Sequence, residues 1–282
     1  MPMTINTNIA SLDAQRNLNA SQGSLATSMQ RLSSGLRVNS AKDDAAGLAI
    51  AERMNAQVRG MNVAVRNAND GISMSQTAEG ALSQVGDSLQ RMRELAVQAR
   101  NSTNSSSDKD SLNKEFSQLQ GEILRVLGGT TFNGKHILGA DATSLTFQIG
   151  ANTTADDTIS VTTVNMTQDT SITAVTGSTT VIDATADATA IGTVINQIDA
   201  AIDNVNDTRA TFGATESRFD AIITNLQTSV ENQSAARSRI MDADFAAETA
   251  NMSRAQVLQQ AGTAMVAQAN QMPQQVLKLL QG

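Results

Sequence analysis

The sequence predicts a mainly α fold: a long antiparallel helical bundle or coiled-coil rod, with a small β-hairpin region and paired terminal helices. Apolar residues recur at three- and four-residue spacing in both halves of the chain, which is the period of helices packed in a left-handed bundle. Only 2 prolines occur, near the two ends. Residues 141–190 differ, because 15 of these 50 residues are Thr, which favours strands. No helix can bury its apolar stripe alone, so the helices should pack side by side.

The first half of the chain predicts two helices separated by a joint. The stripe of the N-terminal helix consists of Leu18, Leu25, Met29, Leu32 and Leu36. A joint is expected at residues 35–42, where Ser40 and Asp43 have the spacing of a capping box that opens the next helix. That helix should span residues 43–100, because its stripe continues without a proline.

The middle of the chain predicts a shorter helix and a hairpin. Backbone-bonding side chains at residues 101–107 form a turn, and the helix after it should end at Gly128-Gly129 as a C-cap. Alternating or β-branched residues at 144–150 and 158–164 predict the two strands of a hairpin. Residues 166–190 have a weak pattern, so we expect irregular structure or short strands there.

The second half predicts two more helices. From Ile191 to Ile240 the apolar residues keep one heptad register. The long polar groups that interrupt this register are Arg209, Glu216, Gln233 and Arg237. The stripe of the last helix consists of Leu258, Ala261, Met265, Ala269, Met272, Val276 and Leu279. Pro273 should weaken that helix near its end.

These elements divide the chain into three expected regions. Residues 1–42 and 241–282 should form a terminal coiled-coil domain with a connecting spoke. Residues 43–140 and 190–240 should form a helical rod. Residues 141–189 should hold the hairpin and a short Thr-rich region.

The terminal helices are candidates for self-assembly. The polar face of the last helix carries Gln and Asn, and amides can be buried when their hydrogen bonds are met. We therefore predict that residues 1–35 and 245–282 fold fully only between subunits, the alternative being a helical hairpin within one monomer. The predicted polymerisation seams are Leu18, Leu25, Met29 and Leu32 in the first helix, and Leu258, Met265, Met272, Val276 and Leu279 in the last.

Composition argues against an enzyme, a cofactor and a metal site. The chain has no Cys and 1 His, so Cys–His catalysis is impossible and Ser–His catalysis would depend on His136 alone. The paired aspartates at 43–44 and 156–157 fit a helix start and a turn. We expect no catalytic, cofactor-binding or metal-binding residues.

Charge and hydropathy argue against nucleic acid and membrane partners. The formal charge is −7, and residues 137–207 contain nine Asp but no Lys or Arg, whereas nucleic acid requires a basic surface. The N-terminus has no basic and apolar signal-peptide pattern. Residues 255–277 are uncharged but rich in Gln and Asn, so burial in lipid would be costly and membrane insertion is not expected.

Several blocks of the chain resemble the bacterial flagellin family. They are residues 5–12 (INTNIASL), 32–50 (LSSGLRVNSAKDDAAGLAI), 89–98 (LQRMRELAVQ), 132–134 (FNG) and 238–248 (SRIMDADFAAE). The resemblance covers roughly residues 1–165 and 190–282. It implies a structural subunit that self-assembles into the secreted, extracellular flagellar filament for motility. In this family the terminal helices form the inner core domain and the bundle forms the outer core domain. With only about 50 residues between Asp141 and Ala190, where the family inserts its variable outer domains, this resembles a short flagellin without the large ones.

The resemblance also implies partners. The main one is a homopolymer of the same subunit. Export by the flagellar type III route implies a chaperone at the C-terminal segment, and assembly implies filament cap and hook-associated proteins. Arg91, Leu95 and Glu115 match the positions of an innate-receptor and inter-subunit surface, which would bind toll-like receptor 5. The alternative is a hook–filament junction protein with the same terminal helices; a coiled-coil adhesin would need an anchor that the sequence lacks.

Overall fold

The computed structural model describes residues 7–280, and the side chains of residues 7–272. The chain forms two compact units: Met1–Ala56 with Glu231–Gly282, here called the terminal unit, and Gln57–Val230, the central unit. The helices are α1 (Ile9–Ser34), α2 (Ala45–Ala99), α3 (Ser106–Gly129), α4 (Thr170–Thr176), α5 (Ala188–Met241) and α6 (Phe245–Leu280). The boundary between the units falls inside α2 and α5. The predicted mainly α fold with paired terminal helices is confirmed.

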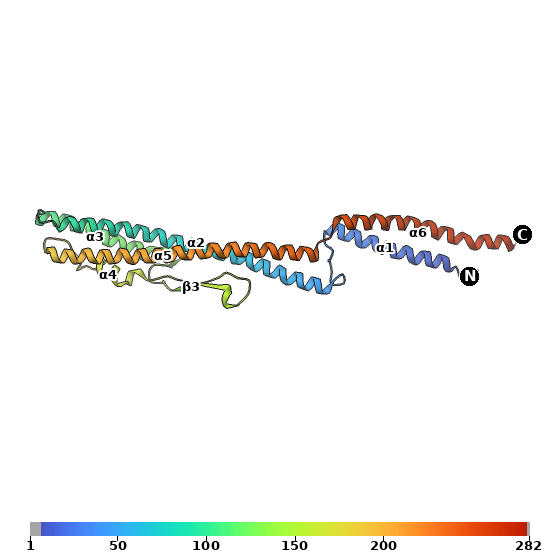
Figure 1. Ribbon diagram of the computed structural model, residues 1–282, viewed down its shortest axis with the longest axis horizontal. Helices are drawn as coiled ribbons and strands as arrows, with labels where there is room; N and C mark the ends of the chain where they lie inside the picture. Colours follow the sequence, from blue (N-terminus) through green and yellow to red (C-terminus); the bar gives the residue numbers. More distant parts are fainter. Residues whose placement is uncertain (1–6, 281–282) are drawn as a thin grey trace. The chain divides into compact units, whose positions relative to one another are not determined.

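In the terminal unit, α1 and α6 lie side by side (Figure 1). Helix α1 begins where the Asn8 side chain accepts a hydrogen bond from the Ser11 amide. It ends at Gly35, whose φ of 72° lets its amide bond the Arg31 carbonyl. Helix α6 continues through Pro273 to Leu280.

The segment between α1 and α2 is held by backbone hydrogen bonds to the end of α5. The amides of Arg37 and Val38 both donate to the Met241 carbonyl, at 2.7 and 3.3 Å. The Arg37 guanidinium donates to the carbonyl of Ile240 at 2.8 Å. Val38 and Met241 are buried in a small apolar cluster. These contacts fix the joint predicted at residues 35–42.

The predicted capping box at Ser40 is wrong, because Asp44 caps α2 instead. The Asp44 carboxylate accepts from the Gly47 amide at 2.7 Å, and its carbonyl accepts the first helical bond, from Leu48. Asp43 closes the preceding turn by accepting from Ser40 and from the Asn39 amide. The hydrogen bonds from Ser40, and then that from Asn39, lower the pKa of Asp43.

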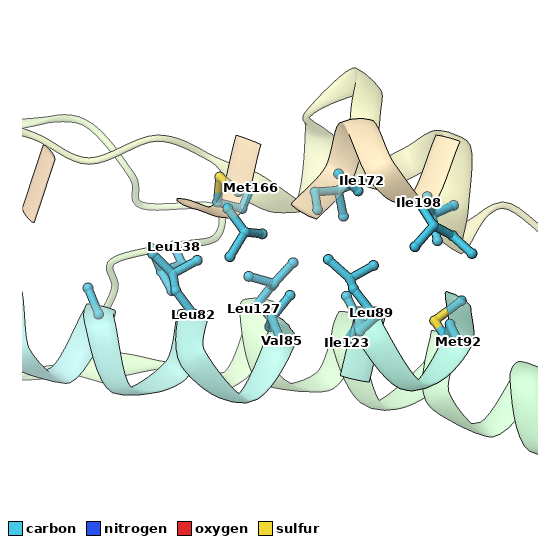
Figure 2. Packing of buried hydrophobic residues seen from close by; sticks show 14 of the residues in the cluster. Leu82, Val85, Leu89, Met92, Ile123, Leu127, Leu138, Met166, Ile172 and Ile198 are labelled. Atoms are coloured by element: carbon cyan, nitrogen blue, oxygen red, sulfur yellow. The ribbon is translucent and has the colours of Figure 1, made fainter. Parts of the chain in front are cut away.

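The core of the central unit lies between α2, α3, α5 and the segment that carries α4. Figure 2 shows side chains of α2 and α3 facing Met166, Ile172 and Ile198 across this core. The α2 and α3 members labelled there are Leu82, Val85, Leu89, Met92, Ile123 and Leu127, and all are fully buried. Helix α3 begins with a capping box between Ser105 and Asp108, and ends at Gly129 with an extended Thr130 as its C-cap rather than a glycine.

Two antiparallel hairpins follow α3. Strands β1 (Thr131–Phe132) and β2 (Lys135–His136) enclose Asn133 and Gly134, whose φ values of 48° and 78° suit a tight two-residue turn. Strands β3 (Ser144–Gln148) and β4 (Thr158–Thr162) form the predicted hairpin, with Ser144 opposite Thr162 and Gln148 opposite Thr158. Phe147 of β3 packs edge-on against Phe219 of α5, with ring centroids 5.5 Å apart.

Residues 166–190 contain a 3-10 turn (η2, Met166–Gln168), helix α4, an irregular stretch at 177–187 and the start of α5. Of the two expected alternatives, short strands are therefore wrong, and irregular structure holds for residues 177–187. Side chains of α3 hold this segment through its backbone. Buried Gln120 donates to the carbonyls of Val175 and Thr180 at 2.8 and 3.0 Å, and Asn113 accepts from the Ile182 amide at 3.0 Å. Ile172, Val175 and Ile182 are thereby buried against the core.

Replacing Gly71 should destabilise the central unit. A Cβ at Gly71 of α2 would lie 2.5–3.1 Å from three ring atoms of Phe219, which is fully buried and cannot move away. We expect Gly71→Ala to cost about 1–3 kcal/mol in urea denaturation, through overpacking. The control is Gly86→Ala in the same helix, where a Cβ would meet nothing within 4 Å. That change should stabilise by about 0.5–1 kcal/mol, and equal effects at both sites would contradict the overpacking explanation.

Glu216 of α5 should make stability depend on pH. Burial of its carboxylate raises its pKa, and the charges of Glu79 and Asp220 raise it further. One carboxylate oxygen is buried with no hydrogen-bond partner among the described residues. A carboxylate whose pKa rises on folding lowers the free energy of unfolding while it is ionised. This destabilisation disappears as the pH falls below the folded-state pKa and then below the pKa of the group in the unfolded chain.

We therefore expect Glu216→Gln to raise Tm at pH 7, because the amide carries no charge. The difference from wild type should shrink as the pH falls and be near zero below about pH 4. Asp87→Asn, at an exposed position without an ion pair in the described chain, is the control and should change Tm little. A Tm gain from Glu216→Gln that persists unchanged at pH 4 would show that charge is not the cause.

Candidate self-assembly surface

The interface between α1 and α6 is a heptad seam built largely from small residues. The buried or half-buried seam positions of α1 are Ser11, Ala14, Leu18, Ser21, Leu25, Ser28 and Leu32. Those of α6 are Glu248, Met252, Ala255, Gln259, Gly262, Val266 and Ala269. A Cβ at Gly262 would lie 3.2 Å from Leu18 Cδ1, so the two helices approach closely. Both sets step by three and four residues, as in a coiled coil, but Ser, Ala and Gly bury little apolar area.

Polar groups in this seam are only partly satisfied within one chain. Near one end, the Ser11 hydroxyl donates to the Asn270 side chain at 2.7 Å and the Asn8 amide donates to the Ala269 carbonyl at 2.8 Å. Farther along the seam, Arg31 Nη1 lies 4.0 Å from the largely buried Glu248 carboxylate. Arg31 Nε is buried and has no hydrogen-bond partner among the described residues. The ion pair between Arg31 and Glu248 is therefore weak, and no other described residue supports the Arg31 Nε.

Large apolar side chains of both helices face away from the seam. In α1 and α6 the exposed set is Ile9, Leu12, Met29, Phe245, Val257, Leu258, Met265 and Met272. Leu258, Met265 and Met272 are 53%, 59% and 47% exposed and repeat every seven residues. They form one apolar stripe along α6, here called the α6 stripe. Such a contiguous stripe is typical of a protein–protein contact surface.

Two open grooves lie along the helix pair. One, of about 660 Å³, is lined by residues that include Leu18, Gly262, Leu258 and Met265. The other, of about 560 Å³, is lined by residues that include Leu258, Arg31 and Glu248. Because both are also lined by Ala20, Ser21, Ser24 and Leu258, they are continuous. The combined groove presents apolar walls at one end and charged groups at the other.

The predicted polymerisation residues fall into three groups. Leu18, Leu25 and Leu32 are half-buried and lie in the seam with α6. Met29 is 54% exposed, because Ser28 occupies the seam position beside it; it joins the outward-facing set with the α6 stripe. Val276 and Leu279 belong to α6, but their side chains lie outside the described residues.

Sequence reasoning missed most of the small seam residues. Ser11, Ser21 and Ser28 of α1 and Ala255 of α6 are buried but were not predicted, whereas the buried Ala269 was in the predicted stripe of the last helix. A search for large apolar residues passes over them. The serines are spaced by ten and seven residues, and Ala255 lies fourteen residues before Ala269, which fits the three- and four-residue steps of a coiled coil and could have identified them.

The predicted receptor surface lies in the central unit and contains only two of its three residues. Arg91 of α2 lies between Glu115 of α3 and Glu94, with 2.8 Å to each carboxylate. The hydrogen bonds from Glu115 and then Glu94 raise the pKa of the Arg91 guanidinium. Leu95 was predicted on this surface, but its side chain is 0% exposed. It belongs to the core of the central unit and does not lie on the surface with Arg91 and Glu115.

None of the helices in the described part of the chain combines the length and the apolar character needed to cross a bilayer.

Comparisons with known proteins match nearly the whole chain to bacterial flagellins. Residues 5–143 match the family model for the bacterial flagellin N-terminal helical region, and residues 195–280 match that for the bacterial flagellin C-terminal helical region. A flagellin of Xenorhabdus nematophila is 44% identical over 99% of this chain and 100% of its own length. A flagellin of Halalkalibacterium halodurans is 45% identical, again over 99% of this chain and 100% of its own.

A solved structure is also similar. The crystal structure of Bacillus cereus flagellin has 34% sequence identity and a TM-score of 0.50, and the match covers 61% of this chain and 94% of that one. Nearly the whole sequence therefore has counterparts in flagellins, and 61% of the chain has a structural counterpart in one of them.

Proposed function

Because the chain belongs to the bacterial flagellin family and is a structural, non-enzymatic subunit of the flagellar filament, we propose that its terminal helices make the contacts that join subunits. The filament is an extracellular polymer of this subunit and serves motility. A hook–filament junction protein, the alternative, is not favoured, because the full-length relatives are flagellins.

The observation that supports this assignment is the α6 stripe beside a continuous groove. Each Leu or Met side chain that becomes buried stabilises a contact by about 1.5–3 kcal/mol. The stripe offers Leu258, Met265 and Met272 at one helical spacing, and the groove offers a complementary hollow lined by small residues. A helix of a neighbouring copy fits such a surface, because ridges of one helix pack into the groove between two others.

A triple substitution of the stripe tests this proposal. Leu258→Gln with Met265→Gln and Met272→Gln keeps helix propensity but removes the apolar area. We expect a folded subunit that no longer forms filaments, measured by sedimentation and electron microscopy. The control is Gln256→Ala with Gln260→Ala at exposed polar positions of the same helix, which should polymerise. A normal yield of filaments from the triple variant would refute the proposal.

We propose that residues 1–42 with 241–282 act as the inner core domain and connecting spoke, and that residues 43–140 with 190–240 act as the outer core domain. Residues 141–189 would then be the short variable region. The heptad seam of α1 and α6 supports the first assignment, and the shared core of α2, α3 and α5 supports the second.

We further propose that the subunit is secreted, and that before assembly an export chaperone covers the C-terminal segment. The exposed α6 stripe supports this, since it would otherwise favour premature association. The triple Gln variant should lose chaperone binding in a pull-down. The same surface would contact filament cap and hook-associated proteins at the two filament ends.

We also propose that Arg91 and Glu115 contribute to a surface recognised by toll-like receptor 5. Both side chains are about half exposed and share one ion pair, so a partner could bind them together. Glu115→Lys should lower activation of receptor-bearing cells by purified monomer, whereas the neighbouring Lys114→Glu should not. Equal activation of the cells by wild type and by Glu115→Lys would refute this assignment.

A further inference from the structure

One face of α2 carries unpaired arginines. Arg59 and Arg66 are exposed and neither makes an ion pair or a side-chain hydrogen bond among the described residues. Val63 lies between them and is 43% exposed. The spacing of four and three residues puts all three on one side of the helix, opposite the buried Ala64 and Ala68. These three residues are here called the basic stripe.

One face of α5 carries unpaired aspartates. Asp203 and Asp207 are exposed, four residues apart, and their carboxylates make no ion pair with any described residue. They lie opposite the buried Ala201 and Val205, so they point away from the core. No Lys or Arg occurs between residues 137 and 207 to neutralise them from nearby sequence. These two residues are here called the acidic stripe.

The two stripes cannot meet within one chain. Helices α2 and α5 run antiparallel in the central unit, and Arg93 pairs with Asp199 at 2.6 Å, which sets their relative level. Asp203 therefore lies near the level of residue 89, about 23 residues along α2 from Arg66. At 1.5 Å per residue that is an axial separation of roughly 35 Å. The two stripes also lie on the outward sides of their helices.

We propose that the basic stripe of one subunit contacts the acidic stripe of a second copy displaced along the helix axis. Each stripe would pair with a different neighbour, so the contact is head-to-tail. A head-to-tail contact that does not close on itself generates an open polymer, as a filament subunit requires. This inference rests on the polymer that the family membership establishes, and it adds a contact in the central unit to the one proposed for the terminal helices.

The charges of the two stripes would align neighbouring copies. Each copy has a formal charge of −7, so copies repel one another at long range. A local match of two arginines with two aspartates offsets that repulsion and sets the axial position of neighbours. Exposed ion pairs stabilise by only about 0.2–1 kcal/mol each, so their contribution is to alignment more than to total affinity.

Charge reversal tests the proposal. Arg59→Glu with Arg66→Glu should raise the critical concentration for seeded polymerisation roughly tenfold at low salt, and Asp203→Arg with Asp207→Arg should do the same. The combination of all four changes keeps the net charge at −7 and should polymerise like wild type. Lys114→Glu with Lys135→Glu changes two exposed lysines that form no ion pair within the described residues; it is the control for net charge alone and should polymerise well.

A cysteine pair gives a second measurement, since the chain has no Cys of its own. Arg66→Cys with Asp203→Cys cannot form a disulfide within one chain, because that needs Cα atoms within about 7 Å. In assembled filaments it should give a ladder of linked subunits on a non-reducing gel, whereas the unassembled monomer should give none.

Three results would overturn the proposal: wild-type polymerisation by either reversed pair, a folded quadruple variant that does not recover, or filaments without the ladder. None of them depends on the α6 stripe. If instead the triple Gln variant of that stripe forms normal filaments while the charge results hold, the terminal-helix proposal fails and this one stands.

Discussion

Removing residues 255–282 is expected to abolish polymerisation and to leave the central unit folded. The deletion takes away the whole α6 stripe and the seam residues from Ala255 onward, so α1 loses most of its partner. The central unit, Gln57–Val230, keeps its own core. Circular dichroism should retain the helices of that unit and its cooperative melting. Sedimentation and electron microscopy should find no filaments, even after addition of wild-type seeds.

A smaller change gives the matched control for this truncation. The double substitution Gln256→Ala with Gln260→Ala keeps the length of α6 and should polymerise. Filaments built by the truncated chain would refute the assignment of assembly to the terminal helices. Loss of the cooperative melt would instead show that the central unit depends on them.

The second large effect is expected from Phe219→Ala. The Phe219 ring is fully buried, packs against Gly71 of α2 and lies edge-on to Phe147 of the β3–β4 hairpin. Its removal leaves a cavity that α2 cannot fill, because the nearest residue there has no side chain. Phe→Ala changes in cores cost about 3–5 kcal/mol, so urea denaturation should show a loss of this size.

The hairpin should also respond to Phe219→Ala. It keeps the hydrogen bond from the Asn67 side chain to the Gln148 carbonyl, at 2.9 Å, but loses its aromatic contact. Amide exchange in β3 and β4 should therefore accelerate more than exchange in α3. The control is Phe245→Ala, at a position 58% exposed, where a surface change should cost no more than about 0.5 kcal/mol. Comparable losses from the two alanines would contradict the importance of burial.

The long helices could be predicted from the sequence, because their seams are made of large apolar residues. Ile191, Ile198, Val205, Phe212 and Phe219 repeat every seven residues, and all are buried in the structure. Such a repeat predicts a helix whose apolar face packs into the core. The β3–β4 hairpin was predictable for a similar reason, since its strands alternate and a polar loop separates them.

The remaining features depend on contacts distant in the sequence. Residues 166–190 carry no strong period, and α4 is docked by Gln120 and Asn113 of α3. In α1, Met29 was assigned to the stripe, but Ser28 is the buried seam residue and Met29 is 54% exposed. Leu95 was placed on the surface by family resemblance, whereas its side chain is fully buried in the core of the central unit.

The serine- and alanine-rich packing between α1 and α6 has a consequence for the energetics of this helix pair. So little hydrocarbon leaves water when the two helices meet that an isolated copy gains only a small free energy from pairing them. We therefore expect surrounding copies to supply most of the ordering free energy, so by mass action the apparent stability of this helix pair should rise with protein concentration. A melting temperature of the terminal segments is therefore a property of the concentrated assembly, and dilution alone should lower it.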